Sequence, residues 1–190
     1  LAEGLVNSAY NVVLIDRQNH HQFQPLFYQV ASARLEPSNI SFPFRKIFQK
    51  SHNVEIRLAN VIRIDSLQQT LFTDEGQISY DKLVIATGCK TNYFGNVGIK
   101  NFAFAMKSTE DAINIRNQIL LNFEKYLFSS EDEKIALMNI VIVGAGPTGV
   151  ELAGAFSEMK KHVLPKDYPG IDFSTLKIIL VEGSKNTLNS

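Results

Sequence analysis

The feature that most constrains the fold is a set of three glycines, Gly144, Gly146 and Gly149, spaced as Gly-x-Gly-x-x-Gly. The set directly follows the apolar run Asn139–Val143 and directly precedes a run of helical character over 150–159. Such spacing also occurs by chance, but between a strand and a helix it is typical of a turn that binds a dinucleotide. The sequence therefore predicts a strand–loop–helix unit with a pyrophosphate site.

Each position of this loop has an expected mechanical role. Gly144 allows the tight turn out of the strand, Gly146 lets the backbone approach a pyrophosphate, and Gly149 lets the helix pack closely on the sheet. Pro147 is tolerated because a first-turn N–H has no partner within the helix. The loop, including Thr148, therefore presents backbone N–H groups and the positive end of the helix dipole to the phosphates.

An acid one strand further along completes the pattern. Glu182 follows the apolar run Lys177–Val181, where a carboxylate is expected to accept hydrogen bonds from ribose hydroxyls. An acid there disfavours a 2′-phosphate, so we expect NADH to be preferred over NADPH. Lys185 is close in sequence, and its positive charge weakens this preference. The gap from the glycines is long, and we interpret its excess, 160–176, as an inserted loop. The alternative is a purely structural turn with Glu182 on the surface.

The first part of the chain shows a second pattern of the same type. The apolar run over 11–16 ends in an acid, Asp16, and follows a stretch of helical character over 1–10. These features are typical of the crossover helix and second strand of another dinucleotide fold, with Asp16 as either a ribose acid or a strand-end cap. We therefore expect a first strand and its glycine loop before Leu1, which would make the chain a fragment.

The strand pattern predicts the fold class. Near-continuous apolar runs are typical of parallel strands covered on both faces, so we expect an α/β protein with Rossmann-like parallel sheets and flanking helices. Between the two halves, short β-rich runs are separated by turn residues such as Asp74-Glu75-Gly76. They predict a strand near 54–64, a hairpin through 70–79 and a returning strand over 82–86.

Cap signals predict the helices. A capping-box-like start at Ser108 predicts a helix over 109–128, and the segment 41–48, with Pro43, predicts a shorter one. The charged run over 129–134 is interpreted as a linker.

Composition excludes several classes of function. The 190 residues include 19 Lys and Arg against 19 Asp and Glu, which leaves no net charge for binding a nucleic acid. The single cysteine, Cys89, excludes dithiol chemistry and is expected to be a small packed residue. His20 and His21 are adjacent and lack a ligand cluster, so no metal site is expected. No apolar run reaches the roughly 18 residues of a membrane helix and no export signal is present, so we expect a soluble chain.

Three longer strings resemble a known family. The segments 20–37, 79–88 and 140–156 closely resemble type II NADH dehydrogenases, the non-proton-pumping NADH:quinone oxidoreductases. These enzymes belong to the FAD-dependent pyridine nucleotide-disulphide oxidoreductases, which contain two dinucleotide-binding domains. The glycine loop and the ATG motif occur across that superfamily, whereas the strings PLFYQVA and GPTGVELAG are more specific to this branch.

The resemblance implies two partial domains with a small antiparallel β element between them. Residues 1–106 would belong to an FAD-binding domain and residues 107–190 to an NADH-binding domain. The implied FAD contacts are Asp16 and Arg17 at the adenosine, Val61 at the adenine, Ala86, Thr87 and Gly88 along the cofactor, and Pro25, Leu26, Tyr28 and Gln29 beside the flavin. An aromatic side chain such as Tyr28 could equally belong to the core.

The resemblance also assigns the second half. The implied NADH contacts are Gly144, Gly146, Pro147, Thr148 and Gly149 at the pyrophosphate and Glu182 at the ribose. Glu151 is the catalytic candidate, near the point where the nicotinamide would meet the flavin. An acid in the first turns of a helix is also favoured by the helix dipole, so this role and a structural one both remain open.

The activity that the resemblance implies is that of a respiratory-chain flavoprotein. NADH would give a hydride to FAD, and electrons would then pass to a membrane quinone. The resemblance further implies peripheral association with the cytoplasmic side of the inner membrane through a C-terminal region, and it allows a homodimer. Because parts of the family's domains are not in this segment, the segment by itself is not expected to need activity as an enzyme. The alternatives are another FAD-dependent NAD(P)H oxidoreductase, such as a ferredoxin or rubredoxin reductase, and a non-catalytic dinucleotide-binding module.

Overall fold

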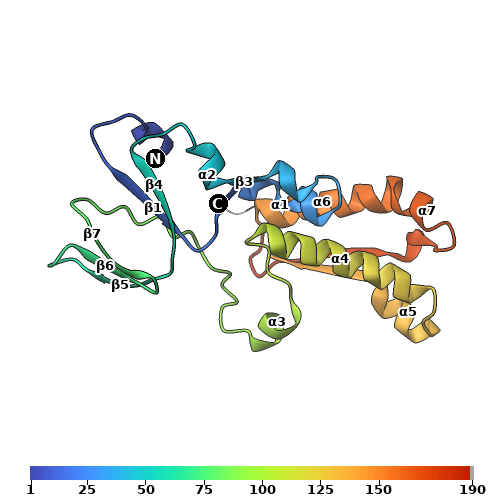
Figure 1. Cartoon of the computed structure of the whole chain (residues 1–190). Helices are drawn as coiled ribbons and strands as arrows, with labels where there is room; N and C mark the ends of the chain where they lie inside the picture. The colour runs from blue at the N-terminus through green and yellow to red at the C-terminus, as the bar shows by residue number, and fades with distance from the viewer. Residues whose placement is uncertain (189–190) are drawn as a thin grey trace. The chain divides into compact units, whose positions relative to one another are not determined.

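The computed structural model describes residues 1–188 and divides the chain into two compact units. The first unit consists of Leu1–Gln22 and Ser41–Lys90, and the second of Phe23–Ile40 and the chain from Thr91 onward. Figure 1 labels the helices and strands of the chain. The predicted division into an FAD part and an NADH part at residue 106 stays a prediction, and the segment Phe23–Ile40 is a structural member of the second unit.

The first unit is built mainly from strands. Its elements are β1 (Val12–Asp16), β2 (His20–Gln22), β3 (Ser41–Pro43), α2 (Phe44–Ile47), β4 (Val54–Leu58), β5 (Val61–Asp65), β6 (Thr70–Thr73) and β7 (Gly76–Ser79). β1 and β4 form a parallel pair, β2 and β3 an antiparallel pair, and β5, β6 and β7 a three-stranded antiparallel sheet. The predicted strand near 54–64 is therefore two strands, and the small antiparallel element is confirmed.

In the first unit the predicted strand over 82–86 is wrong, and the predicted short helix over 41–48 is confirmed in part. The segment 82–86 forms no strand, and Val84 and Ile85 are 62% and 65% exposed, because no neighbouring strand among residues 1–188 pairs with it. The short helix begins at Phe44, after Ser41–Pro43 has paired with β2, so the chain before it is extended.

The expected helix over 1–10 is also wrong, since only a 3-10 turn at Glu3–Leu5 forms. Asn7 has a left-handed backbone with φ of 60°, which ends helical structure for an ordinary residue. Asn53 then takes over the hydrogen bonding of this segment, because its side-chain amide donates to the carbonyls of Leu5 and Tyr10. The N-terminal segment is consequently tied to the chain just before β4.

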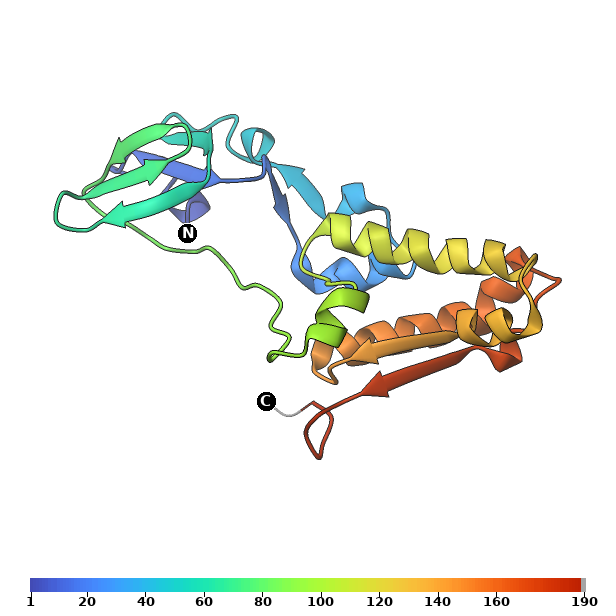
Figure 2. The same ribbon diagram turned by 90° about the horizontal axis from the view of Figure 1, so that it is seen from below.

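The second unit is an α/β layer. Its elements are α1 (Phe27–Ala31), α3 (Val97–Phe102), α4 (Thr109–Tyr126), α5 (Glu131–Leu137), β8 (Asn139–Val143), α6 (Pro147–His162), α7 (Leu164–Asp167) and β9 (Lys177–Val181). β8 and β9 form a parallel pair in which Asn139 lies opposite Lys177 and Val143 opposite Val181. α6 packs against both strands, and α1 packs against α4 and α6 (Figure 2).

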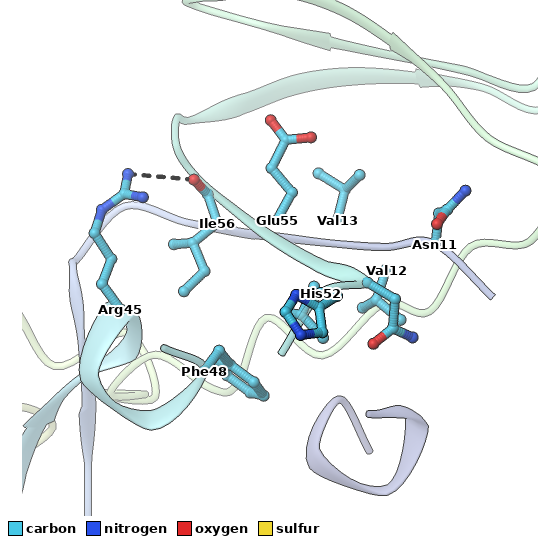
Figure 3. Close-up of a pocket in the computed structure, with 10 residues that line it drawn as sticks. Asn11, Val12, Val13, Arg45, Phe48, His52, Glu55 and Ile56 are labelled. Atoms are coloured by element: carbon cyan, nitrogen blue, oxygen red, sulfur yellow. Dashed lines mark hydrogen bonds between the residues drawn. The ribbon is translucent and has the colours of Figure 1, made fainter. Parts of the chain in front are cut away.

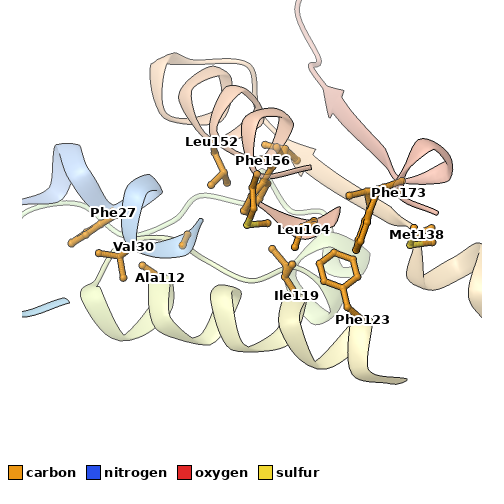
Figure 4. Packing of buried hydrophobic residues seen from close by; sticks show 14 of the residues in the cluster. Phe27, Val30, Ala112, Ile119, Phe123, Met138, Leu152, Phe156, Leu164 and Phe173 are labelled. Atoms are coloured by element: carbon orange, nitrogen blue, oxygen red, sulfur yellow. The ribbon is translucent and has the colours of Figure 1, made fainter. Parts of the chain in front are cut away.

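The core of the second unit lies between these helices and the strand pair. Phe123 on α4 is almost fully buried, and its ring meets that of Phe173 edge-on at a centroid distance of 5.2 Å. Phe156 on α6 is buried in the same cluster, and Phe27 and Val30 extend it to α1 (Figure 4). The cluster thus fixes α6, the helix that begins at the glycine loop.

Helix predictions for the second unit are partly confirmed. α4 begins where Ser108 accepts a hydrogen bond from the N–H of Asp111, as expected. The predicted linker over 129–134 is wrong, because Ser130 and Glu133 form a capping box that starts α5. The predicted loop over 160–176 is largely wrong, because α6 continues to His162 and the short helix α7 and a 3-10 turn at Phe173–Thr175 follow.

The β8–β9 pair departs from the expected burial. The side chains of Ile142 and Leu180 face the core, but Val141 and Val143 on the other face are 56% and 52% exposed. Within residues 1–188 only one face is covered, because α6 packs on that face alone. Among these residues no helix is both long enough and apolar enough to cross a membrane.

Candidate nucleotide-binding site

The glycine loop joins β8 to α6 as the sequence predicts. Gly144 has a φ of 103°, a backbone conformation that residues with a side chain rarely adopt, and this conformation turns the chain out of the strand. Gly149 lies so close to the turn that a Cβ there would be 1.9 Å from the carbonyl oxygen of Gly144. The first and third glycines are therefore required by the turn and by close packing.

The middle of the loop is open toward solvent. Gly146 is the N-cap of α6, and no heavy atom lies within 4 Å of the position a Cβ would take. Pro147 occupies the first turn, followed by Thr148, and the amides of a first turn have no partners within the helix. The combination of empty space, backbone N–H groups and a helix N-terminus suits a phosphate group.

Glu182 is held directly beside this loop. The register of the β8–β9 pair brings the end of β9 next to the turn. A hydrogen bond from the N–H of Gly144 to the carbonyl of Val181 continues this pairing into the loop. Oε2 of Glu182 accepts a hydrogen bond of 2.7 Å from the N–H of Ala145, and Oε1 accepts one of 2.8 Å from the N–H of Ser184. These amides, that of Ala145 first, hold the pKa of Glu182 below its usual range, so the carboxylate is charged at neutral pH.

The catalytic candidate Glu151 lies on α6, four residues after Pro147, and is exposed. It shares the helix with the glycine loop, but nothing in the structure tests a catalytic role.

The adenosine candidates of the first unit lie at the ends of its strands. Asp16 is the last residue of β1, and Oδ1 accepts a hydrogen bond of 2.9 Å from the N–H of Gln18. Its carbonyl accepts a second from the N–H of Ala59, two residues before Val61 opens β5. Arg17 follows β1 and is exposed. Asp16 thus lies at the carboxyl end of a parallel strand, where a dinucleotide fold places its ribose acid, and Val61 lies at the start of the antiparallel strand β5.

The ATG segment has no regular structure. Ala86, Thr87 and Gly88 are exposed, and Gly88 has a φ of 69° that suits a glycine. Cys89 is exposed as well, which corrects the expectation of a packed cysteine. The positive φ explains the glycine of this motif, and the assignment to FAD stays a prediction.

The flavin candidates Pro25, Leu26, Tyr28 and Gln29 belong to the second unit. The first two lie in a 3-10 turn, Gln24–Leu26, and the others on α1, where Nε2 of Gln29 donates to the hydroxyl of Tyr28. Because α1 packs on α6, this segment and the glycine loop are parts of one compact unit. Sequence reasoning did not foresee this placement.

Two further features concern other chemistry. His20 and His21 lie on β2, and no group of histidine, cysteine and carboxylate residues suited to a metal ion occurs in the described part of the chain.

A cavity of about 560 Å³ in the first unit is lined by β1, α2 and β4, where Arg45 donates to the carbonyl of Ile56 (Figure 3). None of the predicted site residues lines this cavity.

Comparison with known proteins places these observations in a family. A family described as pyridine nucleotide-disulphide oxidoreductase matches residues 1–187. The type II NADH:quinone oxidoreductases Ndh and NdhA of Mycobacterium tuberculosis are 38% and 34% identical, each over 98% of this chain and over 42% and 41% of their own lengths. The structure of NDH2 from Plasmodium falciparum in complex with NADH matches with a TM-score of 0.87 and 28% identity, covering 94% of this chain and 38% of that one.

The comparisons confirm the resemblance to type II NADH:quinone oxidoreductases and the α/β fold class. The chain spans about two fifths of the length of the curated relatives it matches. From the family match over residues 1–187, the chain belongs to the pyridine nucleotide-disulphide oxidoreductase family.

Proposed function

We propose that this chain forms the nucleotide-binding part of an NADH:quinone oxidoreductase that uses FAD. In this proposal NADH binds at the glycine loop, a hydride passes to FAD, and electrons continue to a membrane quinone. The observation that carries the proposal is the 2.7 Å hydrogen bond between Glu182 and the N–H of Ala145, which places a charged carboxylate beside an open helix N-terminus. The names of the mycobacterial relatives, as NADH:quinone oxidoreductases, support the same activity.

The residues present fit the diphosphate and the sugar of NADH. The open position at Gly146 leaves room for a diphosphate, and the amides of Thr148 and Gly149 belong to the first turn of α6. Glu182 is charged and can accept hydrogen bonds from ribose hydroxyls, and the same charge disfavours a 2′-phosphate. The chain's contribution is therefore to bind NADH, to select it over NADPH and to orient it.

The FAD contacts are proposed from the resemblance of the first part of the chain to type II NADH dehydrogenases. Asp16 would accept from the adenosine ribose, Arg17 and Val61 would lie at the adenosine, and Ala86, Thr87 and Gly88 would follow the cofactor. Pro25, Leu26, Tyr28 and Gln29 would line the flavin, and Glu151 would lie near the nicotinamide. When bound, FAD supplies the redox chemistry, and the chain's residues supply binding, orientation and exclusion of water.

The cellular setting belongs to the proposal as well. We place the enzyme at the cytoplasmic side of the inner membrane as a peripheral protein, with a homodimer as its assembly. Residues 1–106 would serve FAD and residues 107–190 NADH. Structures named as ferredoxin and rubredoxin reductases are 19% and 16% identical to this chain, so they share its fold, and no feature of the site favours their activities.

The glycine loop is tested by titrating the chain with NADH in a calorimeter. Gly146→Val should abolish binding because its side chain fills the space for the diphosphate, while the fold stays intact. Gly154→Val is the matched control, since Gly154 is exposed on α6 away from the loop and the variant should bind normally. Normal NADH binding by Gly146→Val would refute the assignment.

The ribose acid is tested in the same titration. Glu182→Ala should weaken NADH by about 10-fold or more, because a charge-assisted hydrogen bond to the sugar is lost. Glu131→Ala is the control, since it removes an exposed carboxylate on α5 that bonds only to Lys134 among the interactions described. A full-length protein that is colourless and releases no flavin on denaturation would instead indicate a non-catalytic binding module.

A further inference from the structure

The loop residue Ala145 is held on both sides by the chain that follows β9. Its N–H donates to Glu182, as described above, and its carbonyl accepts a hydrogen bond of 2.8 Å from the N–H of Leu188. Ser184 closes the turn between these two contacts, because its hydroxyl donates to the carbonyl of Asn186 at 2.8 Å. Ala145 is 1% exposed. We call residues 182–188 the clamp segment.

The two contacts of Ala145 determine where the neighbouring amides point. A peptide group is planar and trans, so a carbonyl and the N–H of the next residue point in opposite directions. Because the carbonyl of Ala145 is directed at Leu188, the N–H of Gly146 must point away from the clamp segment. No heavy atom lies within 4 Å of the Cβ position at Gly146, so that side of the loop is open.

Without such contacts a glycine loop would be costly to order. Gly144 and Gly146 flank Ala145, and glycine loses more conformational freedom on ordering than any other residue. A loop that is fixed before its ligand arrives avoids this cost at the moment of binding.

We propose that the clamp segment sets the glycine loop in its binding conformation before a nucleotide binds, with Glu182 as the positioning residue. The identity of the ligand, a dinucleotide with a free ribose, rests on the proposed function. Glu182 then acts at both ends of the site: it fixes the loop that receives the diphosphate, and it accepts from the sugar.

One carboxylate can perform both tasks. A carboxylate has about four acceptor sites on its two oxygens, and the bonds from Ala145 and Ser184 use one on each oxygen. The hydroxyl of Ser184 and the N–H of Gly183 also interact with this carboxylate, so a ribose hydroxyl would bind by taking the place of one of them. In this proposal nucleotide binding exchanges these lesser contacts for ribose hydroxyls and leaves the bond between Glu182 and the N–H of Ala145 in place.

The proposal is tested by amide hydrogen exchange of the whole chain in the absence of nucleotide. Glu182→Ala should speed exchange at the Ala145 amide by about 10-fold or more, because its acceptor is removed. Glu182→Gln keeps one acceptor oxygen and should restore most of the protection, a rescue that a purely electrostatic role would not give. Glu131→Gln, which removes a charge on exposed α5, should change nothing at Ala145.

A second variant leaves the acid in place. Ser184→Ala removes the hydroxyl that closes the turn to Asn186 and that also interacts with Glu182, so exchange at Leu188 and Ala145 should rise while the carboxylate itself is retained. Unchanged exchange at Ala145 in both Glu182→Ala and Ser184→Ala would overturn the clamp.

NADH titration of the same variants separates the positioning role of Glu182 from its proposed role in binding the ribose of NADH. Affinity should fall in the order wild type, Glu182→Gln, Glu182→Ala, in parallel with Ala145 protection. Weaker NADH binding by Glu182→Ala with unchanged Ala145 exchange would overturn the positioning role and keep the ribose role. A wild-type chain that shows the exchange pattern but binds no NADH would refute the proposed function and leave the clamp standing.

Discussion

The two compact units are stabilised in different ways. The second unit contains the large buried cluster around Phe123 and Phe156, which joins α1, α4, α6 and the β8–β9 pair. In the first unit the buried apolar side chains are few: Phe48, Ile56, Ala59 and Leu71. Polar contacts take a larger share there, most clearly at Asn53 and at the Asn60–Asp74 pair.

This difference in stabilisation affects how firmly each unit holds its candidate binding residues. In the second unit a packed core fixes α6, so the loop at its N-terminus begins from a rigid helix, and Glu182 adds a contact to that loop. In the first unit the acid Asp16 contacts amides nearby in its own unit, those of Gln18 and Ala59 through its side chain and its carbonyl. The glycine-loop site is therefore the more preorganised of the two.

The largest expected effect is the loss of the aromatic core. Phe123→Ala should lower the free energy of unfolding of the second unit by about 3–5 kcal/mol, since it leaves a cavity beside Phe173 and Tyr168. Hydrogen exchange of α4 and α6 amides measures this unit directly. Phe128→Ala is the control, because Phe128 is 91% exposed and its loss should change stability by less than about 0.5 kcal/mol. Equal effects of the two variants would contradict the described core.

The next effect separates two glycines on α6. Gly149→Ala should lower stability by about 3 kcal/mol, because the added Cβ meets the backbone oxygen of Gly144, which cannot move away without distorting the turn. Gly154→Ala should raise stability by about 0.5–1 kcal/mol, because the position is open and alanine favours the helix. Thermal unfolding of both variants measures the difference. Similar shifts of the same sign would show that the close approach at Gly149 is not required.

Local patterns explain which elements could be predicted from the sequence. β1, β8 and β9 lie within a residue of the predicted runs, and the strand–loop–helix at Gly144–Gly149 was predicted because turn, cap and packing requirements all fall within about ten residues. α5 could have been found, since Ser130 and Glu133 have the spacing of a capping box. Its charged residues instead favoured the interpretation as a linker.

Other features depend on distant parts of the chain and leave no local signal. The run at 82–86 has strand-like composition, but a strand also needs a partner, and none of the described residues supplies one. The packing of Phe27 and Val30 on α4 and α6 joins segments that lie far apart in the sequence. The bond between Glu182 and Ala145 likewise spans 37 residues, and only the register of β8 with β9 brings the two together.

The polar contacts of the first unit predict a smaller effect at Asn53. Its Nδ2 donates to the carbonyls of Leu5 and Tyr10, while Oδ1 accepts from the N–H of Asn7. Asn53→Asp keeps the shape but replaces the donor by an oxygen that faces those carbonyls, so the first unit should lose about 2 kcal/mol. Exchange of β1 and β4 amides measures the loss. Asn53→Ala should cost less than Asn53→Asp, and the reverse order would show that the amide does not donate as described.

The smallest effect is a pH dependence of the β5–β6 hairpin. Oδ1 of Asp74 accepts from the N–H of Asn60 at 2.8 Å and Oδ2 from its side-chain amide at 2.6 Å, and these bonds, that of the side chain first, lower the pKa of Asp74. A carboxylate whose pKa is lowered by folding stabilises the folded state, and this stabilisation is complete at a pH above the pKa of the unfolded chain, about 3.9. The stabilisation is lost as the pH falls through the lower pKa of the folded state.

The hairpin should therefore loosen in acid in the wild-type chain and not in Asp74→Asn. The amide introduced by Asp74→Asn does not titrate. After correction for intrinsic exchange rates, exchange at the Asn60 amide of that variant should therefore be independent of pH below about pH 4. In the wild-type chain the same amide should exchange increasingly fast as the pH falls. Asp132→Asn, on α5 of the second unit, should keep the wild-type dependence. A wild-type profile identical to that of Asp74→Asn would show that this contact adds nothing to the stability of the first unit, and the larger share of polar contacts there would then depend on Asn53 and on the contacts of Asp16.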